Sequence, residues 1–139
     1  MKRFVLDASV ALAWLIDPSP APYALRVQKY LQDGARAVVP ALWRLELANG
    51  FVTAERRGNV TPTDAAEILE NFEIVLARSI EDSQQPISMK RIIGIAHKFL
   101  LTAYDAQYLD TAITQDLPLA TLDRKLEHAA ERAGVPLVS

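Results

Sequence analysis

The chain has 139 residues, a formal net charge of −2 at pH 7 and a pI of about 5.7. Its composition, 50% hydrophobic and 23% charged, is typical of a folded domain and argues against disorder. Because the chain is slightly acidic, any contact with nucleic acid must come from a local basic patch or from bound cations. The absence of cysteine excludes disulfides, thiolate zinc sites and a cysteine nucleophile.

The length predicts a single domain over residues 1–139, large enough to bury its own core. An apolar stretch near the N-terminus imitates a signal peptide, but Asp7 interrupts it. No stretch approaches the ~18 apolar residues that a membrane span requires. We therefore expect a cytoplasmic protein without a membrane partner.

Strand-like and helix-like patterns alternate along the chain. In the first half they predict a strand at 4–6, helices at 9–16 and 24–31, a strand at 37–40, and helices at 42–57 and 61–76. In the second half they predict a strand at 79–81, helices at 87–100 and 103–115, a strand at 117–121, a helix at 123–133 and a strand at 135–138. This alternation favours an α/β fold in which helices cover both faces of a mainly parallel sheet.

Three aspartates lie where a predicted strand ends or a predicted helix begins: Asp7, Asp105 and Asp123. Aspartate at a helix start often serves as an N-cap, which contributes about 1 kcal/mol, so each residue taken alone favours a cap. Open α/β sheets, however, bind their ligands at the carboxyl ends of the strands. We therefore expect the three carboxylates to converge at one edge of the sheet.

Glu46 lies inside the predicted helix 42–57, one turn before Asn49 and within an apolar stripe. A buried acid is costly unless it has a partner, and Arg44 lies on another face of this helix. A metal ion shared with other carboxylates explains Glu46 better than a buried salt bridge does. An all-oxygen site suits Mg²⁺ or Mn²⁺, which lower the pKa of a bound water and stabilise phosphoryl displacement.

Four motifs in order along the whole chain resemble the PIN domain, and more narrowly the VapC-type toxins of bacterial toxin–antitoxin pairs. They are the apolar-Asp-Ala-Ser run ending at Ser9, Leu-Glu-Leu-Ala-Asn at 45–49, Tyr-Asp-Ala-Gln-Tyr-Leu at 104–109 and Leu-Ala-Thr-Leu-Asp at 119–123. The resemblance implies a three-layer α/β/α fold with a central, mainly parallel sheet of four to five short strands. It also implies an endoribonuclease that uses Mg²⁺ or Mn²⁺ and leaves a 5′-phosphate and a 3′-hydroxyl.

Residue by residue, the resemblance implies catalytic, metal-ligating roles for Asp7, Glu46, Asp105 and Asp123, and supporting polar roles for Ser9, Asn49 and Thr121. Arg124 and Lys125 directly follow Asp123 and are candidate RNA contacts.

The chain departs from the family pattern at Asp110, where a small or apolar residue is commoner. We expect Asp110 on the surface, with a modified metal environment as the alternative. The segment 83–95 also departs from the pattern, so RNA specificity cannot be inherited there.

The helix 42–57 has a second apolar face, formed by Trp43, Leu47 and Ala54 with Phe51 nearby. Packing within the monomer is one explanation; covering a partner is the other. The family resemblance implies a homodimer, which we assign to the helical hairpin 42–77, and a cognate antitoxin in a groove toward the active site.

Two other interpretations remain open. A catalytically silent PIN-fold module would keep the fold for protein contacts, although the four intact acids argue against it. Another acidic-pocket phosphotransfer domain would carry paired acids after the first strand and a lysine before a late proline. Asp7 stands alone, and Val135-Pro136 lacks that lysine.

Overall fold

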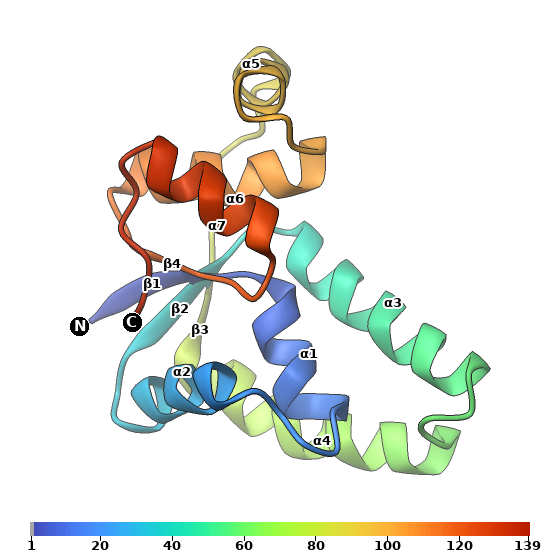
Figure 1. The fold of residues 1–139 in the computed structure, drawn as a ribbon. Coiled ribbons are helices and arrows are strands. Elements are labelled where there is room, and N and C mark those ends of the chain that lie inside the picture. The colour runs from blue at the N-terminus through green and yellow to red at the C-terminus, as the bar shows by residue number, and fades with distance from the viewer. Residues whose placement is uncertain (1) are drawn as a thin grey trace.

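A computed structural model describes residues 2–139, and its centre is a four-stranded parallel sheet (Figure 1). The strands are β1 (Arg3–Leu6), β2 (Arg36–Val39), β3 (Ile80–Asp82) and β4 (Leu119–Ala120). They lie in the order β3-β2-β1-β4, and every neighbouring pair is parallel. The predicted parallel sheet is therefore confirmed, including its short third strand.

Helices cover both faces of this sheet, which makes three layers. They are α1 (Ala8–Ile16), α2 (Pro22–Gln32), α3 (Leu42–Arg56), α4 (Pro62–Ser79), α5 (Met89–Phe99), α6 (Ala103–Gln115) and α7 (Arg124–Arg132). In the view of Figure 1, α5, α6 and α7 lie above the sheet, whereas α1, α2 and α4 lie below it. The pair α3 and α4 forms a hairpin that projects beyond the sheet.

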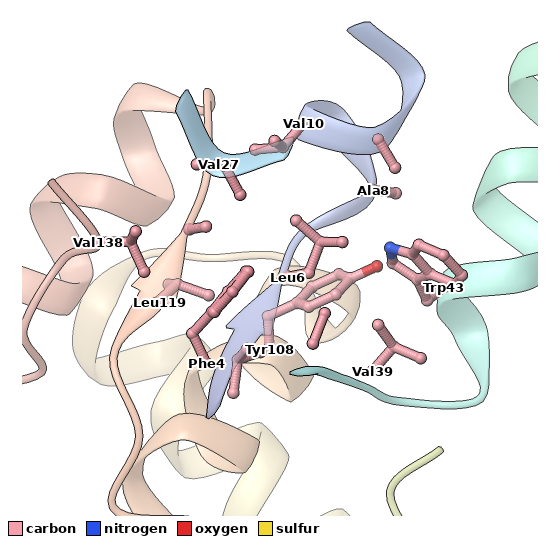
Figure 2. Close-up of a cluster of buried hydrophobic side chains, with 14 of the residues drawn as sticks. Phe4, Leu6, Ala8, Val10, Val27, Val39, Trp43, Tyr108, Leu119 and Val138 are labelled. Atoms are coloured by element: carbon pink, nitrogen blue, oxygen red, sulfur yellow. The ribbon is translucent and has the colours of Figure 1, made fainter. Parts of the chain in front are cut away.

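The core explains why the first strand is an unbroken apolar run. Phe4, Val5 and Leu6 are all fully buried, because helices cover both faces of β1. Figure 2 shows this strand at the centre of the cluster, between Leu119 of β4 and Trp43 of α3. The residue that follows the strand is therefore held by a rigid, fully packed support.

The C-terminal strands are shorter than predicted. Only residues 119 and 120 of the predicted strand 117–121 form a strand, and the predicted strand 135–138 is reduced to one bridge between Leu137 and Leu119. Both segments contain a proline, Pro118 and Pro136, which has no N–H to donate to a ladder. Their carbonyls still accept hydrogen bonds, from Val5 and Leu119 respectively.

The second apolar face of α3 is covered by the chain itself. Trp43, Leu47, Phe51 and Ala54 are at most 6% exposed, and the Trp43 ring lies 6.2 Å from that of Phe72 in α4, centroid to centroid. The interpretation that this face covers a partner is therefore wrong, because α1 and α4 pack against it within the monomer.

Other apolar side chains of α3 remain exposed. Leu45 is 72% exposed and Val52 is 41% exposed, so they are the large apolar side chains of α3 that are available to a partner. The α1 contact is close: a Cβ added at Gly50 would clash with Cδ2 of Leu12, so a larger residue there would force the Leu12 side chain to shift.

Asp110 is buried, at 3% exposure, and the prediction of a surface position is wrong. Helix α5 packs over α6 and brings Arg91 to this carboxylate, with Nη2 at 2.7 Å and Nε at 3.0 Å from Oδ1. Gln85 Nε2 donates to the other oxygen at 3.0 Å. Asp110 thus joins α6 to α5 and to the segment before it.

None of the helices in residues 2–139 has the length and apolar character to cross a bilayer.

Candidate functional site

Two polar residues meet where β1 and β4 end. Asp7 follows β1 and Thr121 follows β4, and these strands are neighbours in the sheet. The hydroxyl of Thr121 donates to Oδ2 of Asp7 at 2.7 Å, and the hydroxyl of Ser9 donates to the same oxygen at 2.7 Å. Asp7 is only 5% exposed, so these two donors compensate much of the cost of its burial.

Backbone amides fix the direction of both hydroxyls. The Ser9 oxygen accepts from the Leu122 N–H at 3.1 Å, and the Thr121 oxygen accepts from the Asp123 N–H at 3.0 Å. Each hydroxyl has one proton, and its oxygen already accepts a hydrogen bond from a backbone N–H, so the proton is donated to Asp7. Among the hydrogen bonds of residues 2–139, none runs from a side chain to Oδ1 of Asp7, so this oxygen retains acceptor capacity.

Of Asp7, Asp105 and Asp123, only Asp123 caps a helix through hydrogen bonds from backbone N–H groups to its side chain. Asp123 caps α7, its Oδ1 accepting from the N–H groups of Lys125 at 2.8 Å and Leu126 at 3.3 Å. Asp7 makes no such bond to α1. Thr102 caps α6 instead of Asp105, which lies in the first turn of that helix. The burial of Asp7 and the placement of Asp105 therefore need another explanation.

Glu46 has a partner that sequence reasoning missed. The hydroxyl of Tyr108 in α6 donates to Oε1 of Glu46 in α3 at 2.6 Å. Figure 2 shows the buried Tyr108 ring inside the core, with its hydroxyl directed toward Trp43 of α3. Glu46 is half-buried and Leu45 beside it is exposed, so the prediction that Glu46 lies within a buried apolar stripe is wrong. The expectation that Glu46 has a partner is met by Tyr108. The available signal was a tyrosine three residues after Asp105, within the 104–109 motif.

Burial and mutual repulsion raise the pKa of three of these acids. The pKa of Asp7 is raised by burial and, less, by the charge of Asp123, against hydrogen bonds from Ser9 and Thr121. Burial also raises the pKa of Glu46, with added repulsion from Asp7 and Asp105. The pKa of Asp105 rises to about 6 through burial and the charges of Asp123 and Asp7. The four predicted acids are thus brought within electrostatic range of one another.

The donor set fits a hard divalent cation in its chemistry. Four carboxylates that repel one another are stabilised by a cation between them, and oxygen ligands alone favour Mg²⁺ or Mn²⁺. Within residues 2–139, no group of three acidic, histidine or cysteine side chains is close enough to hold a metal as it stands. Holding a cation would therefore require some of these carboxylates to approach one another, and Glu46 and Asp105 are the half-buried members of the set whose pKa burial raises.

The other predicted residues divide into two groups. Ser9 and Thr121 contact Asp7 directly, whereas Asn49 is exposed and none of the hydrogen bonds found in residues 2–139 involves its side chain. Lys125 is exposed, and its charge lowers the pKa of Asp105, so it lies near the acids. Arg124 lines a pocket with Glu127 and with Thr121, the residue that holds Asp7.

Comparisons with known proteins agree with this architecture. The chain matches the family model described as PIN domain over residues 4–132. Its structure is similar to PAE2754 from Pyrobaculum aerophilum, with a TM-score of 0.68 and 23% identity over 92% of this chain and 84% of that one. It is also similar to FitAcB from Neisseria gonorrhoeae, with a TM-score of 0.65 and 18% identity over 98% of this chain and 96% of that one. At these identities the likeness concerns the fold. No sequence among curated proteins matches the chain significantly.

Proposed function

Because this chain belongs to the PIN-domain family, whose members are in general nucleases, we propose that it is an endoribonuclease dependent on Mg²⁺ or Mn²⁺. We further propose that it is the VapC-type toxin of a toxin–antitoxin pair. The observation that carries the proposal is the electrostatic coupling of Asp7, Glu46, Asp105 and Asp123 at one edge of the sheet. An arrangement of acids that raises its own pKa values is costly unless a cation occupies it.

The proposed mechanism assigns one task to each residue. When bound, a divalent cation lowers the pKa of the attacking water and stabilises negative charge on the phosphate. Asp7 would help to hold the cation, while Ser9 and Thr121 fix its Oδ2 by hydrogen bonds. Glu46 would be a second ligand, oriented by the Tyr108 hydroxyl at its Oε1. Asp105 and Asp123 would add ligands from the N-terminal ends of α6 and α7.

The proposed antitoxin site is a groove of about 410 Å³ between α1, α2 and α4. It includes Gly34 and Ser79, which precede β2 and β3, so it lies at the opposite end of the sheet from the acids and not toward the active site as the resemblance implies. Its walls include Trp14, Leu31, Phe72 and Val75, and Ile74 at its rim is 60% exposed. An amphipathic segment of the antitoxin fits such a groove by covering these apolar side chains. The proposed homodimer uses the 42–77 hairpin through Leu45 and Val52, both exposed on α3.

The deciding experiment is cleavage of RNA by the purified chain with Mg²⁺, with Mn²⁺ or with EDTA. Cleavage is expected with either metal and not with EDTA, and Asp7→Asn or Asp105→Asn should abolish it. The control Asp17→Asn changes an exposed aspartate after α1 and should retain full activity. Cleavage that survives EDTA and both substitutions would refute the metal-site proposal. Absence of cleavage by the wild-type protein on every RNA tested would favour the silent binding module.

Metal binding supplies a second test that does not need the correct RNA target. Calorimetric titration with Mn²⁺ should detect binding to the wild type and to Asp17→Asn, and a large loss of affinity in Asp7→Asn. Equal affinity in all three proteins would contradict the assignment of Asp7.

A further inference from the structure

A basic groove lies between α5 and the C-terminal ends of α6 and α7, away from the acids. Its volume is about 500 Å³, and every titratable residue that lines it is basic: Lys90, Arg91, Lys98 and Arg132. Arg91 is neutralised by Asp110. Within residues 2–139 the other three cations make no salt bridge, so their charge is available to a ligand.

Phe99 organises two of these cations. Lys98 Nζ lies 5.4 Å from the centroid of the Phe99 ring, and Arg132 Cζ lies 5.5 Å from it. Cations from two different helices are thus held over one aromatic ring, and their attraction to its face keeps them beside the groove. Gly94 lies one turn from both Lys90 and Lys98 on α5, and a Cβ added there would meet no atom within 4 Å. The groove is therefore open above this glycine.

One face of α7 connects the groove to the acids. Lys125, His128 and Arg132 are exposed and recur at intervals of three and four residues, which puts them on the same side of the helix. Glu127 and Glu131 fall on a different side by the same periodicity. Lys125 lies near Asp105, so the N-terminal end of this face is beside the acids. Arg132 lies over Phe99, so its C-terminal end is at the groove. Lys125 and Arg132 are roughly 10 Å apart along the helix axis, at about 1.5 Å per residue.

We propose that the groove binds the phosphodiester backbone of RNA and receives the strand that leaves the acids along the Lys125–Arg132 face of α7. This inference rests on the proposed function, since it assumes that RNA is the substrate. Cations with no carboxylate beside them bind phosphates without reading the bases, so the groove contributes affinity and not sequence preference. It also explains how a chain with a net charge of −2 binds a polyanion.

Binding is tested without cleavage, by fluorescence anisotropy in EDTA with a single-stranded RNA of about 12 nucleotides. The variant Lys98→Ala/Arg132→Ala should bind several-fold more weakly and reduce the slope of log affinity against log salt by about 1.4, or ~0.7 per lost contact. Gly94→Glu should also weaken binding, because it places a negative charge between Lys90 and Lys98. The control Arg26→Ala/Lys29→Ala removes two exposed charges from α2, on the other face of the sheet, and should bind as the wild type does.

Cleavage of substrates of different lengths supplies the second test. The double variant should raise KM for a long RNA and leave a dinucleotide substrate unaffected, because a dinucleotide is too short to reach Arg132. Unchanged RNA affinity and salt slope in both groove variants would overturn the groove, even if the wild type cleaves RNA. If the wild type binds RNA through the groove and never cleaves it, the ribonuclease proposal fails and the groove stands.

Discussion

The hydroxyl of Tyr108 donates to Glu46 at 2.6 Å and so joins the helix that carries Asp105 to the helix that carries Glu46. Burial and the charge of Glu46 raise the pKa of Tyr108 far above its ordinary value, so the hydroxyl remains a proton donor at any working pH. The contact fixes one oxygen of Glu46 and the spacing between α3 and α6. It is therefore both a structural link and a device that orients a proposed metal ligand.

Tyr108→Phe tests this link. The ring still fills its buried position, so we expect a folded protein whose free energy of unfolding falls by about 1.5–3 kcal/mol, the range for a lost hydrogen bond to a charged group. Mn²⁺ affinity, measured by calorimetry, should fall as well, because Glu46 is no longer oriented. If stability falls while Mn²⁺ affinity stays at the wild-type value, Tyr108 is only a structural residue.

Thr121→Val tests the support of Asp7. Valine preserves the shape but removes the donor to Asp7 and the acceptor for the Asp123 N–H, so we expect destabilisation of about 1–3 kcal/mol and weaker Mn²⁺ binding. The matched control is Thr111→Val, which also removes a buried threonine hydroxyl, one bonded to the Gln107 carbonyl within α6. Equal losses of Mn²⁺ affinity in the two variants would contradict the specific role of Thr121.

The raised pKa of Asp105 predicts an unusual pH dependence of stability without metal. Its pKa is about 6 in the folded chain and about 3.8 ordinarily, so the folded state binds the extra proton and stability rises as the pH falls through 6. Between about pH 8 and pH 5 the gain should be on the order of 1 kcal/mol, because solvent screens a half-buried carboxyl. Thermal melts in EDTA measure this gain.

The control for that effect is Asp105→Asn, which cannot titrate and should lose the share of the gain that Asp105 contributes, while Asp7 and Glu46, whose pKa values are also raised, retain theirs. Mn²⁺ should also suppress it, because a bound cation favours the charged carboxylate. A melting temperature that falls steadily from pH 8 to pH 5 in the metal-free wild type would show that the coupling of the acids is weaker than inferred.

Asp110→Asn tests whether the buried acid outside the site is structural. Arg91 keeps much of its exposure, so the expected destabilisation is about 1–2 kcal/mol, below that of a fully buried pair. Hydrogen exchange should become faster in α5, which Asp110 joins to α6, while Mn²⁺ affinity stays unchanged. Loss of Mn²⁺ affinity would instead indicate that Asp110 belongs to the metal environment.

Leu45→Glu tests the proposed dimer. Light scattering after size exclusion should show a dimer for the wild type and a monomer for the variant, because a buried charge in the interface has no partner. The control Leu25→Glu changes an exposed leucine on α2, outside the 42–77 hairpin, and should remain dimeric. A monomeric wild type would contradict the assignment.

Local signals explain what was predictable in the fold. The unbroken run Phe4-Val5-Leu6 indicated a strand buried on both faces, and Thr61 followed by Pro62 indicated the start of α4, where the Thr61 hydroxyl accepts from the Asp64 N–H. In both cases the physical cause lies within a few neighbouring residues. The sheet-edge rule also predicted that Asp7, Asp105 and Asp123 converge, because parallel strands bring their carboxyl ends to one edge. Thr121 was assigned through the family resemblance and not through this rule.

Contacts between segments far apart in the sequence were harder to predict. Tyr108 and Glu46 are 62 positions apart, and which of the polar side chains on α3 and α6 meet depends on how the two helices are packed. Asp110 was misplaced for the same reason, since its burial depends on Arg91 arriving from α5. The apolar face that carries Trp43 had two explanations, and only the packing of α4 against it decided between them.

The pairing of β1 with β4 has a consequence for synthesis of the chain. Asp7 and Ser9 leave the ribosome well before their partners at 121 and 122, which are 114 and 113 positions later. A nascent chain that ends before β4 has Asp7 and Ser9 but not the Thr121 hydroxyl, and β1 is then paired with β2 alone, at the edge of the sheet. The acids at the sheet edge are therefore assembled only after β4 and the residues that follow it have been made.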